Sequence, residues 1–557
     1  MAELHGGRLL GQVSPLNISK RKGTDAVFAF AFIACCLAAI VFGSLGIQNN
    51  HYNDLIAGPP ATMECASADS HIQRGLLAVV HRRGLADPKP LDPSQDVKII
   101  AGHAGYLLPS SLTLMLVGVL MIQMLKHCAR PFVYASMIMV PMSLFSAAGT
   151  IYASGDGDVS AACIPMAFAI IFCLLLWCSR RGLRLCAALL EQAAHVLTLH
   201  PGLILVALAL MLLSVAVVAL ALAASVVLFS NGAWVPIHQS SSRGATCLWI
   251  VDSTAAYGVG FVGLALVWTG LLAFTMRFFI VSLVTAMWYF DTAGGAIDAN
   301  ADPAAYQLSA RRAPVRTATR LAFTKSIGTL CYSSLVLTIC QILKAMARQT
   351  QRRSDSLFVC LAACCIRCLL DVIEFLNKFV VAMHAISGAD FCSAGKEITS
   401  LFSRHGLNAW FCDQISAYVL ATASFSFAAL GGGFTYLGVV STLEQPASID
   451  DKRVVASAFG AGAFLLGWFI LSFCGSLILN IVDASYTCLA VDMDNGAQHQ
   501  PPMRDAMIPI VKPDYVVVVQ HPGGPGQPQA AIGMPVATPA TTPHDAQGTT
   551  TSAPPVV

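Results

Sequence analysis

The chain has 557 residues, of which 56% are hydrophobic and 11% are charged, and its formal net charge is +3. Soluble domains carry roughly 25% charged residues, so this composition excludes an ordinary soluble protein. The small, dispersed charge gives no reason to expect a nucleic-acid partner. The apolar residues gather in runs of about 20, the length that an α-helix needs to cross a bilayer. The sequence therefore predicts an all-α, polytopic membrane protein surrounded by membrane lipids.

Ten apolar runs predict ten transmembrane helices. They cover residues 26–46, 106–126, 131–151, 159–178, 202–229, 255–289, 324–346, 357–387, 411–440 and 454–483. Arg8, Lys20, Arg21 and Lys22 precede the first run and place the N-terminus in the cytosol by the positive-inside rule. The first run is too long for the apolar part of a cleavable signal peptide, so it is expected to stay as an anchor. Ten crossings return the C-terminus to the cytosol.

This reading divides the chain into five parts. They are a cytosolic segment 1–25, the first helix 26–46, an extracellular or lumenal loop 47–104, a transmembrane core 105–490 and a cytosolic tail 491–557. The tail contains PGGPGQPQ (522–529) and ATPATTP (537–543), which lack the apolar periodicity that a core requires. We expect it to be disordered.

Two runs leave questions open. Lys344, Arg348, Arg352 and Arg353 would lie outside if every run crosses once, against the positive-inside rule, so segment 357–387 either spans fully or dips in and returns. Segment 255–289 is long for one crossing and contains Arg277, which predicts a tilted or broken helix whose arginine pairs across helices or reaches the interface.

Four charges interrupt the run 357–387. Arg367, Asp371, Glu374 and Lys378 are spaced so that they share one helix face, with Arg367–Asp371 and Glu374–Lys378 able to pair. Ionisable groups inside a bilayer need a partner or a wet cavity. They form either a self-neutralised stripe covered by a neighbouring helix, or a site where Asp371 or Glu374 supplies negative potential to a cationic substrate.

Aromatic residues offer a second element of such a site, because ring faces attract quaternary ammonium groups. Trp268 and Tyr332 lie deep in their runs and are the candidates for a substrate-binding cage. The sequence Trp288-Tyr289-Phe290 ends its run just before Asp291, so it fits the interfacial aromatic belt better.

The sequence Gly388-Ala389-Asp390-Phe391-Cys392 breaks an apolar segment. One interpretation is an irregular stretch that lines a pathway, where freed backbone groups are tolerated. The other is a simple helix end, with Asp390 as the N-cap of an amphipathic helix over 391–404.

Most of the nineteen cysteines lie in or beside apolar runs, where a free thiol behaves as a small hydrophobe. Cys65 and Cys247 fall in expected outer loops, so a disulfide between them is a hypothesis. Cys360, Cys364, Cys365 and Cys368 have helical spacing and no histidine close by, which favours a packed or palmitoylated helix face over a metal site.

Several ordered motifs resemble the choline transporter-like family, solute carrier family 44. They are Arg21-Lys22-Gly23-Thr24-Asp25, Trp288-Tyr289-Phe290, Gly328-Thr329-Leu330-Cys331-Tyr332-Ser333-Ser334-Leu335, Ile339-Cys340-Gln341-Ile342-Leu343, Phe375-Leu376-Asn377-Lys378, Gly388 with Phe391-Cys392-Ser393-Ala394, and Val482-Asp483-Ala484-Ser485-Tyr486-Thr487-Cys488 followed by Asp492, Asp494 and Asn495. The sequence departs from the family in a shorter first outer loop, in His405 and in 421–424.

The resemblance implies a ten-helix transporter of choline, or of a similar quaternary or primary ammonium solute such as ethanolamine, and not an enzyme. It implies the plasma membrane, with an organelle membrane as the alternative. No cofactor is expected. Competing interpretations are transport of another cationic metabolite such as a thiamine derivative, a membrane enzyme acting on lipid headgroups, and a scaffold or channel.

Overall fold

The structure is a computed structural model that describes residues 21–48, 107–153, 159–178, 180–238, 245–291, 313–353, 356–442 and 449–495. These residues form helices and one two-stranded hairpin, which confirms the predicted all-α class. The elements are α1 (Ala26–Gln48), α5 (Leu107–Ala153), α6 (Val159–Cys178), α7 (Arg180–Leu199), α8 (Gly202–Phe229), β1 (Gly232–His238), β2 (Ala245–Val251), α9 (Ser253–Asp291), α11 (Pro314–Thr324), α12 (Ile327–Arg353), α13 (Leu357–Ser387), α14 (Phe391–Thr442) and α15 (Ile449–Asn495).

Seven helices among the described residues are long and apolar enough to cross a membrane. The charges of α13 keep it out of this set, and α6 contributes a shorter apolar stretch, Cys163–Leu174. Non-helical backbone at Cys128 kinks α5 between two of the predicted runs, and Pro131 follows the kink because it cannot donate a helical hydrogen bond. The count of ten and the cytosolic position of both termini stay predictions.

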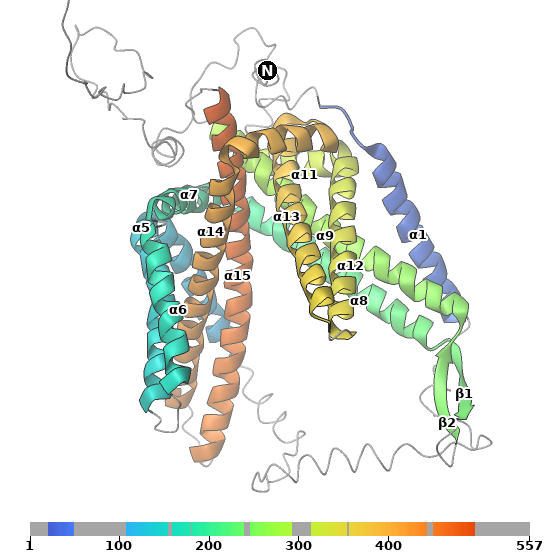
Figure 1. Cartoon of the computed structure of the whole chain (residues 1–557), viewed down its shortest axis with the longest axis horizontal. Helices are drawn as coiled ribbons and strands as arrows, with labels where there is room; N and C mark the ends of the chain where they lie inside the picture. The colour runs from blue at the N-terminus through green and yellow to red at the C-terminus, as the bar shows by residue number, and fades with distance from the viewer. Residues whose placement is uncertain are drawn as a thin grey trace, which may run out of the picture.

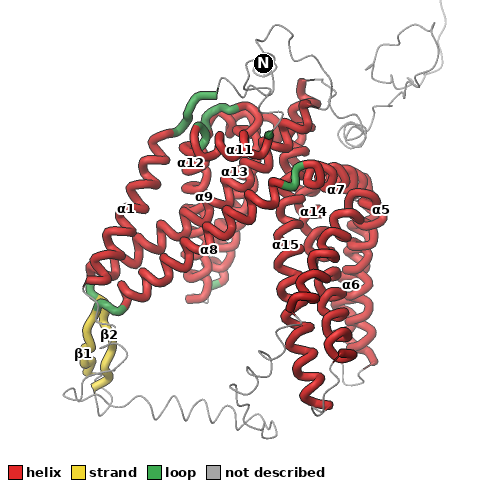
Figure 2. Tube along the Cα trace, turned by 180° about the vertical axis from the view of Figure 1, so that it is seen from behind, coloured by secondary structure: helices red, strands yellow, loops and turns green. Residues whose placement is uncertain are grey.

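The helices form two bundles that meet at one end and diverge toward the other (Figures 1 and 2). The α9 bundle contains α1, α8, α9, α11, α12 and α13, and the α14 bundle contains α5, α6, α7, α14 and α15. The first part of α14 crosses above α11, α12 and α13 before the helix turns down beside α15 (Figure 1). The hairpin of β1 and β2 lies at the opposite end, where α8 ends and α9 begins.

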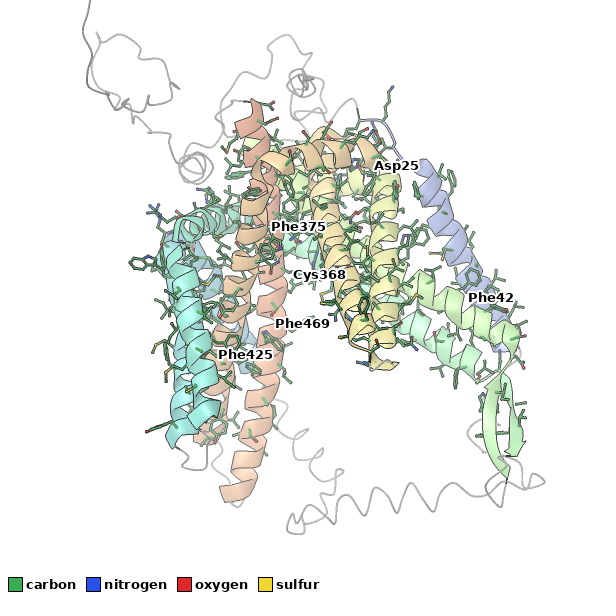
Figure 3. All side chains as sticks on the ribbon, viewed as in Figure 1. Asp25, Phe42, Cys368, Phe375, Phe425 and Phe469 are labelled. Carbon is green, nitrogen blue, oxygen red and sulfur yellow. The ribbon has the colours of Figure 1, made fainter. Side chains whose placement is uncertain are left out.

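The hydrophobic core lies at the end where the bundles meet. Buried side chains come from the last turns of α9 (278–289), α13 (379–386) and α15 (477–491), all of which end there. Toward the other end, large apolar side chains of both bundles are exposed: Leu369 of α13 is 62% exposed and Phe469 of α15 is 55% exposed. Figure 3 shows Phe469 and Cys368 between the two bundles. The bundles are therefore in contact at the core end, which we call the closed end, and apart at the hairpin end, which we call the open end.

Two helices outside the predicted spans complete the core end. Helix α7 is amphipathic yet packs almost fully, because α5, α14 and α15 surround it and bury Leu189, Leu190 and Ala193. Helix α11 buries Leu321 and Ala322 against α9 and keeps its arginines on the other face. Neither has the uniform apolar run by which the spans were predicted.

The open questions about α9 and α13 have clear answers. Helix α13 is one continuous helix of 31 residues, about 46 Å long, antiparallel to α12, so it does not dip in and return. Helix α9 is also continuous over 39 residues, so it is not broken, and its tilt in the membrane stays a prediction. The Arg277 guanidinium lies over the Phe274 ring, 5.3 Å from its centroid, and no ion pair to it is found among the described residues.

Parts of the predicted division fall outside the described residues. These are residues 1–20, most of the loop 47–104 including Cys65, and the tail beyond Asn495. Helix α15 continues past the predicted boundary at 490 to Asn495.

Candidate functional site

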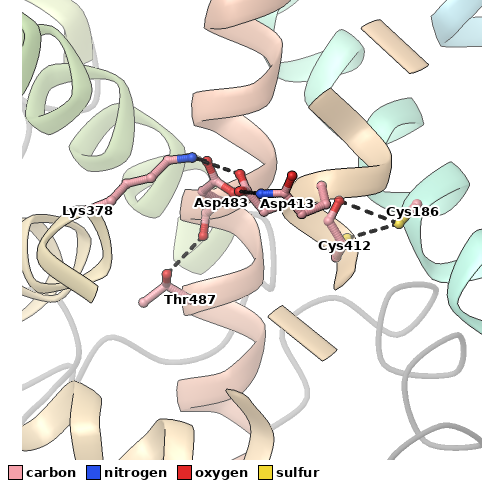
Figure 4. Close-up of polar contacts among 7 residues, drawn as sticks. Cys186, Lys378, Cys412, Asp413, Asp483 and Thr487 are labelled. Atoms are coloured by element: carbon pink, nitrogen blue, oxygen red, sulfur yellow. Dashed lines mark hydrogen bonds and ion pairs between the residues drawn. The ribbon is translucent and has the colours of Figure 1, made fainter. Parts of the chain in front are cut away.

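One lysine and two aspartates join the bundles where they meet, and we call them the junction group: Lys378 on α13, Asp413 on α14 and Asp483 on α15. The Nζ atom of Lys378 lies 2.9 Å from Oδ1 of Asp413 and also contacts Oδ2 of Asp483 (Figure 4). The exposed fractions of these side chains are 17%, 11% and 2%. Two acidic groups thus face one ammonium in a place with little access to water.

Neighbouring helices fix the surroundings of the junction group. The Phe278 ring of α9 faces Lys378, with its centroid 5.9 Å from Nζ, a distance at which a ring and a cation attract. Beside Asp413, the thiol of Cys412 lies 3.2 Å from that of Cys186 on α7. Both thiols are free and buried. The group is thus held between α7, α9, α13, α14 and α15.

A second group of one lysine and two acids lies within the α9 bundle, and we call it the outer group: Lys344 of α12 with Asp371 and Glu374 of α13. The Lys344 Nζ atom is 2.5 Å from Asp371 Oδ1 and 2.8 Å from Glu374 Oε2. Gln341 donates a further hydrogen bond to Glu374 at 3.0 Å. The side chain of Lys344 is 8% exposed, whereas that of Asp371 is 67% exposed.

The charges on α13 are therefore paired differently from the sequence prediction. Glu374 pairs with Lys344, and Lys378 pairs with Asp413 and Asp483, so the expected Glu374–Lys378 pair is not the one that forms. Asp371 likewise pairs with Lys344. All of these partners lie on neighbouring helices, so the charges of α13 connect it to α12, α14 and α15.

Trp268 and Tyr332 both lie against α1. The indole of Trp268 is 4% exposed, donates to Ser334 Oγ at 3.1 Å, and meets the edge of Phe32 at 5.4 Å. The Tyr332 ring stacks on Phe28 with centroids 3.9 Å apart. Both rings thus contact α1, whereas Asp371 and Glu374 contact Lys344 of α12. The four predicted site residues therefore fall into two sets with different neighbours.

The break at 388–392 is a tight turn between two helices. Gly388 ends α13 in the left-handed conformation, with φ of 73°, and its N–H donates to His384 O at 2.8 Å. Asp390 caps α14 by accepting from the Ser393 N–H at 3.1 Å. Hydrogen bonds from the hydroxyl and backbone N–H of Ser393 lower the pKa of Asp390. The structure has the helix end and the Asp390 cap, but α14 continues to Thr442, well beyond the predicted end at residue 404. The pathway interpretation stays a prediction.

Residues 21–25, which we call the N-terminal strap, cover this turn. Arg21 is buried and donates to the carbonyls of Ala385 and Ile386 at the end of α13. Asp25 accepts from the backbone N–H of Phe391 at 3.0 Å and from the Thr329 hydroxyl at 2.8 Å. The strap thereby satisfies backbone groups that the helix ends leave free.

Glycine at 328 permits this close approach. A Cβ atom there would collide with the backbone carbonyl oxygens of Thr24 and Asp25. Lys325, just before α12, donates to the carbonyl of Arg21 at 2.6 Å. The strap, the start of α12 and the α13–α14 turn therefore form one interlocked unit, which explains why the motifs at 21–25, 328–335 and 388–394 belong together.

The cysteine hypotheses stay open. Cys360, Cys364, Cys365 and Cys368 are exposed along α13. Among the described residues, no three His, Cys, Asp or Glu side chains come together as metal ligands. Cys247 lies on β2, opposite Pro236 in the hairpin register, and the disulfide with Cys65 stays a prediction because Cys65 lies outside the described residues.

Residues 163–494 match the protein family described as plasma-membrane choline transporter. The chain belongs to this family. The match includes both charged groups, the α13–α14 turn and both cage candidates, and it confirms the resemblance drawn from the motifs. Membership makes the protein an integral membrane protein of a transporter family.

Individual relatives of this family are distant from the chain. Choline transporter-like 2 of Anopheles gambiae is 28% identical over 184 residues, covering 31% of this chain and 23% of that protein. Protein PNS1 of Mycosarcoma maydis is 26% identical over 181 residues, covering 31% and 34%. A CTL-like protein of Dictyostelium discoideum is 24% identical over 347 residues, covering 59% and 62%. The matched region spans less than two thirds of each relative.

Sequence reasoning missed Lys344, Asp413 and Asp483 as members of charged groups. Asp413 and Asp483 are isolated acids at the borders of predicted spans, and Lys344 stands near the end of another. An ionisable residue in such a position needs a partner, which is a signal, but the sequence does not show which helices become neighbours.

Proposed function

We propose that this choline transporter family member carries choline, or a similar small organic cation such as ethanolamine, across the membrane by alternating access between the two bundles. The observation that carries this proposal is the junction group. It ties the bundles at their closed end by charge, and it holds one more acidic than basic group. Both properties suit a carrier of cations whose bundles move against each other.

The orientation follows from the distribution of basic residues. Four basic residues lie at the core end: Arg184 of α7, Arg316 and Arg320 of α11, and Lys325. In our proposal this end therefore faces the cytosol. The chain crosses the membrane ten times, and both termini lie on the cytosolic side. The open end then faces outward. We place the protein in the plasma membrane, the location named in the description of its family.

The predicted site residues enter this proposal in two roles. Asp371, the most exposed member of the outer group, and Glu374 supply negative potential on the way to the junction group. Phe28 stacks on the Tyr332 ring and Phe32 packs at a steep angle against the Trp268 ring, so both rings can bind a substrate cation when α1 shifts away.

The membrane potential supplies enough energy for accumulation. A monovalent cation gains about 2.3 kcal/mol per 100 mV on moving inward, which corresponds to roughly fifty-fold accumulation. The sequence contains no GxxxxGK[ST] phosphate-binding loop, and the proposal needs no nucleotide.

Uptake of radiolabelled choline into proteoliposomes tests the proposal. We expect saturable uptake that increases under an inside-negative potential and is inhibited by unlabelled ethanolamine. Empty liposomes and liposomes with the Asp483→Asn variant are the controls, and the variant should lose most of the uptake. Release of headgroups from lipids without vesicular uptake would instead identify an enzyme, and uptake of a thiamine derivative alone would change the substrate.

Variants at the four predicted site residues test their roles. Trp268→Ala and Tyr332→Ala should raise the KM for choline, and Glu374→Gln should weaken uptake. If all three variants transport normally at wild-type surface expression, these residues are not part of the substrate site, and the transport proposal is unaffected.

A further inference from the structure

Lys378 differs from an ordinary structural lysine in what it connects. Its helix belongs to the α9 bundle, whereas both of its partners belong to the α14 bundle. An ammonium is a compact point charge on a flexible stem of four carbons, so it can leave one set of partners without moving its helix. It is also the most exposed of the three side chains, at 17%.

The surroundings of the Lys378 ammonium have the features of a site for a free organic cation. Two carboxylates approach it from one side and the Phe278 ring from another. An organic ammonium is recognised by negative charge and ring faces in this way. The Lys378 ammonium thus occupies a site that would also suit a free organic cation, and it is covalently attached to the protein.

An unpartnered amide lies next to this site. Asn480 is three residues before Asp483 on α15, so the two side chains share a helix face about 4.5 Å apart along the axis. Asn480 is only 4% exposed, and its Nδ2 group has no hydrogen-bond partner among the described residues. A buried donor without a partner is costly, which indicates that a ligand group or water pairs with it in another state.

We propose that Lys378 is a tethered cation that substrate displaces, and that the substrate is an amino-alcohol cation, with its ammonium between Asp413 and Asp483 and its hydroxyl on Asn480. This proposal rests on the transport function proposed above. The two-carbon spacing between ammonium and hydroxyl in choline and ethanolamine suits the offset between Asp483 and Asn480. Displacement of Lys378 removes its ion pairs with α14 and α15, so substrate binding loosens the bundles at their closed end.

The test measures equilibrium binding of radiolabelled choline to purified full-length protein, together with uptake. Lys378→Gln removes the competing cation, so the Kd for choline should fall about tenfold while uptake slows. Lys378→Arg keeps the positive charge, and a guanidinium forms bidentate hydrogen bonds with a carboxylate. This variant should therefore compete more strongly with choline and raise the Kd for choline. Lys396→Gln is the matched control: it removes the same charge from an exposed lysine of α14 and should leave the Kd unchanged.

A second measurement tests the hydroxyl contact. Wild-type protein should bind choline more tightly than ethyltrimethylammonium, which lacks the hydroxyl. Asn480→Ala should bind the two equally, and it should do so by weakening choline alone.

The outcomes separate this proposal from the transport function. Wild-type uptake together with an unchanged or higher Kd in Lys378→Gln overturns the tethered-cation proposal and leaves the transport function standing. If Lys378→Gln does not fold, tight choline binding by Lys378→Arg overturns it equally. Absence of choline uptake and binding in the wild type overturns the transport function itself.

Discussion

The junction group and the outer group have the same composition, one lysine and two acids, but they lie in different places. The junction group links helices of two bundles and includes Asp483, which is 2% exposed. The outer group lies within one bundle, between α12 and α13, and includes Asp371, which is 67% exposed. The comparison separates the effect of charge from the effect of location.

Burial sets the strength of each group. A charge that is shielded from water depends on its partners, so removing one partner leaves an uncompensated charge. An exposed charge keeps its water, and the pair contributes little. We therefore expect the junction group to govern stability and the outer group to govern electrostatic attraction.

The largest expected effect is that of Lys378→Met. It leaves two buried carboxylates without a cation and should reduce the free energy of unfolding by about 3–5 kcal/mol. A melting curve in detergent micelles without ligand measures this as a lower Tm. The double variant Lys378→Met/Asp483→Asn should recover part of the loss, because only one carboxyl group, that of Asp413, is then left without a cation. If Lys378→Met had the same Tm as the wild type, the junction group would not govern stability.

Lys344→Met is the matched substitution in the outer group and should have a smaller effect. Asp371 is largely exposed, so the expected loss is about 1 kcal/mol or less. The same melting measurement checks it. If this variant lost as much stability as Lys378→Met, location would not distinguish the two groups.

The smallest effect concerns salt. Attraction by the exposed Asp371 should be screened, so the KM for choline uptake should rise about twofold from 20 to roughly 150 mM ionic strength at constant potential. Asp371→Asn should remove most of this dependence. Asp413→Asn, a buried member of the junction group, should transport less but keep the dependence on salt. An identical salt response in wild type and Asp371→Asn would show that the outer group has no steering role.

The sequence predicts the helices well and their partners poorly. The spans 159–178, 202–229 and 357–387 coincide with α6, α8 and α13, because apolar runs of this length have few other stable structures in a bilayer. Helices α7 and α11 were missed, since their burial comes from neighbours and not from a continuous apolar run.

The site shows the same limit. Lys378 was recognised as a charge that needs a partner, but its partners lie 35 and more residues away, on helices whose positions depend on packing. The N-cap at Asp390 was one of two interpretations, and it could be proposed because a cap contacts its own helix. The cap follows from spacing, whereas spacing does not show whether a charge such as Glu374 pairs within its own helix or with a neighbouring helix.

The turn at Gly388, Ala389 and Asp390 has a mechanical consequence. Only these residues separate α13 from α14, so the Cα atoms at the two helix ends stay within about 14 Å of each other in any conformation. A rotation of about 10° at this pivot would swing the far end of the 31-residue helix α13 by about 8 Å. A small change of backbone angle at this turn would therefore produce a large displacement of α13 at the hairpin end.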